Sequence, residues 1–292
     1  MTAIAAAVEP ATRPRRFVAW KRLLSDPLGR LGLILVIVVV VGAIGADQLA
    51  THDPFKMVMR DRLQAPSLQH WLGTDNLGRD VFSRVLYGGR VALWVSLVAV
   101  YSSLFIGSIL GMLAGYGPRW LDNALLLVFD AVRSFPTVMF AMALVTLVGP
   151  SLDTIILIVV ITSLPLYGRI IRTQTLSLKA QEFILAERAL GAGTFRVLVS
   201  HILPNVIGPV LILASMEIPV VITLEAGLSF LGFGVRPPTP SWGSILNDGY
   251  QFIRDTPWLV IAGGIPLVVS TLGFTLLGEA LRDIFDPKLA RD

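Results

Sequence analysis

Residues 91–116 read VALWVSLVAVYSSLFIGSILGMLAGY, a run of apolar, small and hydroxyl residues without a charged side chain. A helix needs about 20 mostly apolar residues to cross the hydrocarbon core of a bilayer, so this run is long enough. Five further runs are also mostly apolar and qualify as spans, two of them marginally: Leu31–Ala46, Asn123–Leu147, Thr154–Gly168, Asn205–Phe230 and Pro257–Gly278. The sequence therefore predicts an all-α membrane protein with six transmembrane helices.

Composition supports this fold class. Of 292 residues, 54% are hydrophobic and 15% charged, and the mean hydropathy is +0.72. A soluble domain carries about 25% charged residues, so this chain has too little polar surface to face water on all sides. A soluble enzyme, a disordered protein and a nucleic-acid-binding domain are excluded. The absence of cysteine also excludes disulfides and thiolate chemistry.

The distribution of Lys and Arg predicts the topology. The basic cluster before the first run favours an uncleaved anchor with a cytoplasmic N-terminal tail, residues 1–30. Six spans within residues 31–281 then place segment 47–90 and loop 231–256 outside, and loop 172–204 and tail 282–292 inside. The predicted inside carries fifteen Lys and Arg and the outside eight. Six of those eight lie in segment 47–90, which departs from the positive-inside rule.

Two parts of the outside regions have features of their own. In residues 71–90 we expect an interfacial helix with Val81, Phe82, Val85 and Leu86 in the membrane and Arg79, Asp80 and Arg84 in water. The stretch from Pro237 to Gly243 predicts a rigid loop with Trp242 as an aromatic anchor.

Catalytic motifs are not found. His52, His70 and His201 are scattered and lack a metal-binding spacing such as H-E-x-x-H. None of the four lysines follows a glycine, so the chain has no P-loop for ATP. We therefore expect no catalytic residue, no metal site and no cofactor in this chain. Any active transport must take its energy from another chain.

Charged residues inside the predicted spans are candidates for a translocation path, because such charges are costly in lipid. They are Asp130, Arg133, Glu217 and Glu225. Asp130 and Arg133 are three residues apart on one helix and could instead neutralise each other. Glu225 is expected near the outer end of its span, where its carboxylate could also reach the headgroups.

The stretch between the fourth and fifth spans has structure of its own. Residues 179–190 are good helix formers, with Phe183, Ala186 and Leu190 on one apolar stripe. Gly191 is expected to end this helix, and Thr194 can cap a second short helix that runs towards Pro204. Two short helices joined by a glycine turn are predicted at the cytoplasmic face.

This segment resembles a known motif. EFILAERALGA at 182–192, followed by HILPN at 201–205, is similar to the EAA loop of permease subunits in binding-protein-dependent ABC importers, in the form found in the dipeptide and oligopeptide branch. Three more blocks resemble that branch in the same order: LGTDNLGRDVFSR at 72–84, LSFLGFGVRPPTPSWG at 228–243 and LGEALRDIFDP at 277–287. The glutamate of the looser consensus is displaced here, and Arg133 stands where an apolar residue is expected.

The resemblance implies a partnership. The chain would be one of two homologous permeases in the inner membrane of a bacterium, joined to two cytoplasmic ATPase subunits that hold ATP and Mg²⁺ and fed with peptide by an external binding protein. The residues implied to couple to the ATPases are Glu182, Phe183, Leu185, Ala186, Arg188, Ala189, Leu190, Gly191, Ala192 and Arg196.

Two other classes compete with this interpretation. An ion-coupled secondary transporter would use Asp130, Glu217 or Glu225 and need no ATPase, and an intramembrane enzyme would need a nucleophile and base that we cannot name. The sequence leaves the cargo open among dipeptides, oligopeptides, glutathione, opines and nickel chelates.

Overall fold

The computed structural model describes residues 23–285, in which the regular elements are helices joined by turns and loops. The predicted tails, 1–30 and 282–292, therefore lie largely outside the described residues. The elements are α2 (Pro27–Ile44), α3 (Ala46–Leu49), η1 (Met59–Asp61), α4 (Val81–Tyr116), α5 (Arg119–Arg133), α6 (Thr137–Val148), α7 (Leu152–Lys179), α8 (Glu182–Ala189), α9 (Thr194–Arg196), η2 (Val197–Ile202), α10 (Leu203–Phe230), α11 (Trp242–Gln251) and α12 (Pro257–Phe285).

Five helical spans are long and apolar enough to cross a membrane: α2, α4, α7, α10 with its N-terminal extension, and α12. The pair α5 and α6 adds a sixth if it counts as one broken span, since the two helices meet at a bend of 89°. With this pair counted as one span, the number is the six predicted from hydropathy. The third span, however, is not one continuous helix over Asn123–Leu147.

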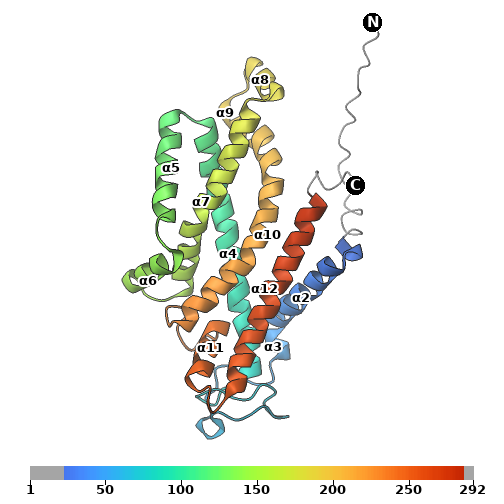
Figure 1. The fold of residues 1–292 in the computed structure, drawn as a ribbon, viewed down its shortest axis with the longest axis vertical. Helices are drawn as coiled ribbons and strands as arrows, with labels where there is room; N and C mark the ends of the chain where they lie inside the picture. The colour runs from blue at the N-terminus through green and yellow to red at the C-terminus, as the bar shows by residue number, and fades with distance from the viewer. Residues whose placement is uncertain (1–22, 286–292) are drawn as a thin grey trace.

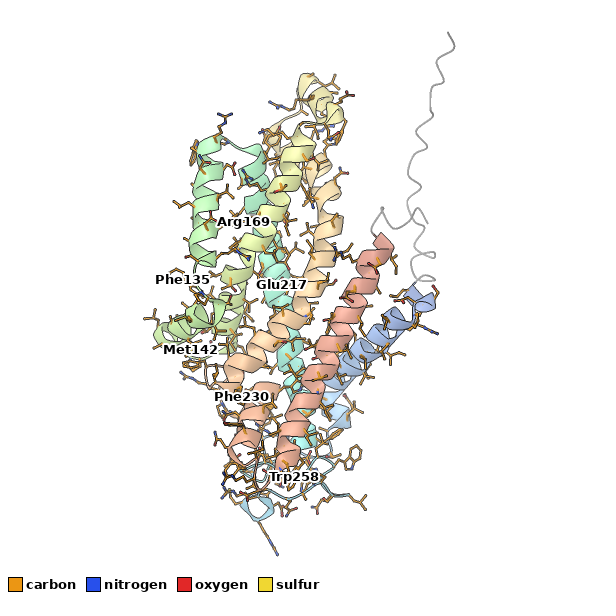
Figure 2. All side chains as sticks on the ribbon, in the orientation of Figure 1. Phe135, Met142, Arg169, Glu217, Phe230 and Trp258 are labelled. Carbon is orange, nitrogen blue, oxygen red and sulfur yellow. The ribbon has the colours of Figure 1, made fainter. Side chains whose placement is uncertain are left out.

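Pro136 explains the break in that span. Proline disfavours the helical conformation of the residue before it and has no N–H to donate into the helix. The chain therefore leaves α5 at Ser134 and restarts α6 after Pro136, which has an extended ψ of 127°. The break at Phe135 lies at mid-height in the molecule (Figure 2).

Glycines allow α4 and α7 to pack closely in the centre of the bundle. A Cβ added to Gly111 would lie 2.5 Å from the carbonyl oxygen of Gly168, and one on Gly107 would lie 2.7 Å from the Cβ of Tyr167. Small residues at this four-residue spacing let two helix backbones approach closely in a membrane. The two helices thus pack most closely where three successive turns of α4 each carry a glycine, Gly107, Gly111 and Gly115.

Helices α2 and α12 run side by side (Figure 1). The described start of α2 and the end of α12 are both directed towards the end of the molecule that carries α8, which we term the α8 end (Figure 1). Residues 47–80 and α11 lie at the opposite end, the α11 end (Figure 1). This arrangement agrees with an even number of crossings.

The fourth span is longer than the prediction of Thr154–Gly168. Helix α7 continues through Pro165 and past Arg169 to Lys179. The connection to the next span is therefore shorter than loop 172–204, because residues 172–179 extend α7 and residues 194–204 belong to the next span. The long apolar run ended at Arg169 in sequence, but a charged side chain at a membrane surface does not end a helix.

The interfacial helix expected over residues 71–90 is wrong. Residues 71–80 form turns, and α4 begins at Val81 with Asp80 as its N-cap, whose side chain accepts from the Ser83 N–H at 2.8 Å. Arg79, Asp80 and Arg84 are buried rather than facing water. Residues 81–90 are instead the first turns of the second span.

Ion pairs explain why these charges are inside. The guanidinium of Arg79 lies 2.6 Å from Asp75, and that of Arg84 lies 3.3 Å from the same carboxylate. Asp248 on α11 completes the cluster at 3.7 Å from Arg79. Burial raises the pKa of the Asp248 carboxyl, although Arg84 and Arg79 favour its charged form. Buried charges are tolerated where they are paired, so this cluster joins residues 75–84 to α11.

Candidate coupling loop and translocation face

Helix α8 and the turn that follows it, residues 182–193, project from the α8 end of the molecule, and we call this projection the knob (Figure 1). It closes with a Schellman motif, in which the Gly191 N–H donates to the carbonyl of Arg188 and the Ala192 N–H donates to that of Glu187, both at 3.0 Å. Gly191 has a φ of +89°, a conformation that glycine adopts without strain. The glycine turn predicted from sequence is confirmed at this position.

The apolar side chains of this loop face outward. Leu190 is 85% exposed and Phe195 is 79% exposed, although both are large and hydrophobic. Of the predicted coupling residues, all except the half-buried Ala192 are exposed: Glu182, Phe183, Leu185, Ala186, Arg188, Ala189, Leu190, Gly191 and Arg196. An exposed apolar patch rimmed by charged side chains is typical of a protein–protein contact.

One residue that sequence reasoning missed holds the knob in place. Ile184 is fully buried and belongs to the same core cluster as Val197 and Ile202 of the following segment. The side chains of His201 and Glu187 also approach each other, at 3.6 Å. Helix α8 therefore packs on η2, which continues directly into α10. In sequence, Ile184 lies between Phe183 and Leu185, two of the residues assigned to the ATPase contact, and no local feature distinguishes it from them.

The second short helix is not a separate element. Gly193, not Thr194, is the N-cap, and it makes no side-chain capping bond. From Thr194 the chain continues through α9 and the π-helical segment η2 directly into α10, so Thr194–Phe230 is one helical span. Single π-helical turns inside helices are frequent at functional sites.

Two of the four predicted path residues line one cavity. Arg133, at the end of α5, and Glu217, on α10, face a cavity of about 220 Å³ whose wall also includes Ser163 of α7. The Ser163 hydroxyl donates to the Glu217 carboxylate at 2.9 Å. Figure 2 shows Glu217 at mid-height on α10, where the α5–α6 break brings Phe135 nearby. The cavity thus presents a cation, an anion and a hydroxyl in the middle of the bundle.

The other two predicted path residues, Asp130 and Glu225, do not line this cavity. Asp130 pairs with Arg169 of α7, so the expected pair within α5 between Asp130 and Arg133 does not form. Glu225 is fully buried and accepts from the Ser229 hydroxyl at 2.7 Å. Its carboxylate therefore does not reach the headgroups, because it is enclosed against the next turn of its own helix and the start of α11.

Comparison with known proteins assigns the family. The family model described as "Binding-protein-dependent transport system inner membrane component" matches residues 107–291, and the model of the N-terminal transmembrane domain of oligopeptide transport permease C matches residues 17–66. Among solved structures, an inward-facing methionine ABC transporter, MetNI, has a TM-score of 0.49 and 18% identity, over 66% of this chain and 94% of that chain.

Curated relatives match over nearly the whole chain. A dipeptide transport system permease protein DppC from Alkalihalophilus pseudofirmus is 39% identical over 93% of this chain and 89% of its own length. A putative peptide transport system permease from Brucella abortus is 37% identical, over 92% and 90%. The glutathione transport system permease protein GsiD of Escherichia coli is 38% identical, over 92% and 89%.

The helices long enough to span a membrane and the family match together define a multi-pass membrane permease of the inner membrane. This chain belongs to the family of binding-protein-dependent transport system inner membrane components, and it is the permease subunit of an ABC importer. Subunits of this family are generally non-catalytic, which agrees with the missing P-loop.

Proposed function

We propose that this chain forms half of a translocation pathway for dipeptides or oligopeptides. A second, homologous permease would supply the other half, two ATPase subunits would bind ATP and Mg²⁺ and drive the cycle, and an external binding protein would deliver cargo. Relatives named for dipeptide, peptide and glutathione transport support this cargo class. The ion-coupled alternative has no such support.

The exposed apolar patch around α8 carries the proposal. Leu190 and Phe195 would insert into a groove on an ATPase subunit, and Glu182, Arg188 and Arg196 would contact its rim. Closure of the ATPases around ATP would then move α8, and through Ile184 and η2 it would move α10. Since α10 contributes Glu217 to the mid-bundle cavity, this motion would switch the pathway between inward-facing and outward-facing states.

The orientation follows from the same proposal. If α8 contacts cytoplasmic ATPases, the α8 end is inside and both chain termini are cytoplasmic. The α11 end, with residues 47–80 and the loop 231–241, would then face the external binding protein. The surplus of Lys and Arg on the predicted inside supports this assignment.

A pair of matched substitutions tests the coupling role. Leu190→Asp places a charge on the knob at a side chain that is 85% exposed, so the fold of this chain should be unaffected. Leu68→Asp makes the same change in residues 47–80, which we call the outer segment, at a residue that is 98% exposed. The ATPase subunits should be lost from the purified complex in Leu190→Asp and retained in Leu68→Asp. Retention of the ATPases and normal uptake in Leu190→Asp would contradict the proposal.

A further inference from the structure

The outer segment brings two histidines and a carboxylate into one cluster that the transport role does not use. These are His52, His70 and Asp80, whose nearest ring nitrogens and carboxylate oxygen all lie within 4.8 Å of one another. The Nδ1 of His70 is 2.8 Å from Oδ1 of Asp80, and the Nδ1 of His52 is 3.7 Å from the same oxygen. Donor atoms about 2.0–2.2 Å from a tetrahedral Zn²⁺ are separated by roughly 3.4 Å. The His52–Asp80 spacing is close to this value, whereas His70 and Asp80 are hydrogen-bonded to each other and would have to separate by roughly 0.6 Å to hold a cation between them.

The two carboxylate oxygens of Asp80 contact different partners. Oδ2 accepts from the N–H of Ser83 at 2.8 Å and from its hydroxyl at 2.7 Å, and thereby caps α4. Oδ1 faces both imidazole rings. Metal-binding carboxylates are usually fixed by hydrogen bonds of this kind to the oxygen that does not bind the ion. The helix cap therefore orients the free oxygen of Asp80 towards the two histidines.

The same serine fixes His52. The Ser83 hydroxyl accepts from the His52 backbone N–H at 3.1 Å, which holds the start of the outer segment against α4. The rings of His52 and His70 are 4.6 Å apart between centroids, and the Thr51 hydroxyl lies 3.0 Å from Nδ1 of His52. Nothing in this arrangement depends on a local sequence motif, since the three ligands come from separate turns of the outer segment.

Access to the cluster is from one side. The side chain of His52 is 37% exposed, whereas those of His70 and Asp80 are 7% and 1% exposed. An ion could therefore enter past His52 and keep a water molecule on its open side. Three protein ligands and one water complete the tetrahedral set that Zn²⁺ prefers with imidazole and carboxylate donors.

We propose that His52, His70 and Asp80 form a binding site for a divalent transition-metal cation, with Zn²⁺ as the best fit. Imidazole nitrogen with carboxylate oxygen suits this class of ion better than Mg²⁺ or Ca²⁺, which prefer all-oxygen sites. The bound ion would tie residue 52 to the N-terminus of α4, and so fasten the outer segment to the bundle. The site is independent of the ATPase contact and of the cavity at Glu217.

Zinc binding to the purified, assembled transporter tests the site. The chain has no cysteine and three histidines, so two histidine variants separate this cluster from the rest. His52→Gln removes the exposed ligand without disturbing the buried ones, and His201→Gln makes the same change in η2. The complexes are purified without a polyhistidine tag, dialysed against buffered Zn²⁺, and their zinc content is measured by mass spectrometry.

Wild type and His201→Gln should each bind one more zinc ion per copy of this chain than His52→Gln. Affinity for that ion should fall at least about 10–100-fold in His52→Gln, the loss seen when only a supporting residue of a metal site is removed. Zinc should also raise the Tm of the wild type but not of His52→Gln. Equal zinc content and equal Tm shifts in wild type and His52→Gln would overturn the proposal. So would the loss of the ion in His201→Gln, or zinc retained in His70→Gln.

Discussion

Replacing Gly191 by valine separates backbone strain from contact loss at the knob. Gly191 has a φ of +89°, and a Cβ added there would meet no atom of this chain within 4 Å. The cost therefore comes from the left-handed backbone alone, about 1–3 kcal/mol for a residue with a side chain. That cost corresponds to a roughly 5–150-fold shift away from the Schellman turn and from the projecting conformation of α8.

Gly193 offers a matched control two residues away. It also has no atom within 4 Å of an added Cβ, but its φ is −70° and its ψ is 156°, which any residue adopts. Threonine has nearly the size of valine and is a good N-cap residue, so Gly193→Thr should leave the loop intact. The two variants differ mainly in the sign of φ at the changed position.

The assay is co-purification of the ATPase subunits with the permease pair, together with peptide uptake in reconstituted vesicles. Gly191→Val should insert in the membrane and pair with the second permease, because the change lies outside the spans. It should lose the ATPases, or hydrolyse ATP without import, whereas Gly193→Thr should behave as wild type. Normal co-purification and uptake in Gly191→Val, and also in a chain with residues 183–190 replaced by a Gly/Ser linker, would refute the reasoning.

Three further predictions concern the spans. An impermeant thiol reagent on intact cells should label Thr239→Cys and spare Glu187→Cys, since the chain has no cysteine of its own; the reverse pattern would invert the topology. Glu217→Gln should reduce peptide uptake roughly tenfold with the ATPases still bound. The amide still accepts from Ser163, but a hydrogen bond to a charged group contributes about 1.5–3 kcal/mol and a neutral one about 0.5–1.5 kcal/mol. Unchanged uptake across a peptide panel would remove Glu217 from the path. Gly111→Ala should destabilise the complex by about 1–3 kcal/mol in thermal unfolding, because its Cβ would lie 2.5 Å from the Gly168 carbonyl oxygen. Gly208→Ala should leave the Tm unchanged, because a Cβ added there would have no atom within 4 Å. Equal Tm values for the two variants would argue against a tight α4–α7 contact.

Local features of the chain were predictable where one segment decides the outcome. Apolar runs long enough to cross a bilayer identified the spans, and Gly191 identified the end of α8. The exposed coupling side chains also followed from the loop sequence. Their role at the ATPase remains a prediction.

Burial was not predictable for residues whose partners come from other elements. Arg79 and Arg84 were expected in water, but Asp75 and Asp248 pair with them inside the protein. Ile184 gave no sign in sequence that it, rather than its neighbours, would enter the core. The partners that could not be foreseen lie in other elements: Asp248 of α11 for Arg79, and Val197 and Ile202 of η2 for Ile184.

The sequence alone determined that this protein crosses a membrane in helices, and that a glycine-ended helix projects between the fourth and fifth of them. Hydropathy and backbone preference act over neighbouring residues, and no distant partner is needed to express them. Only the tertiary structure decided that Arg133 and Glu217 share a cavity, that Asp130 pairs with Arg169, and that two distant histidines meet at Asp80. Electrostatic and coordinating contacts act over a few ångströms in space, and the packing of the helices sets which side chains come that close.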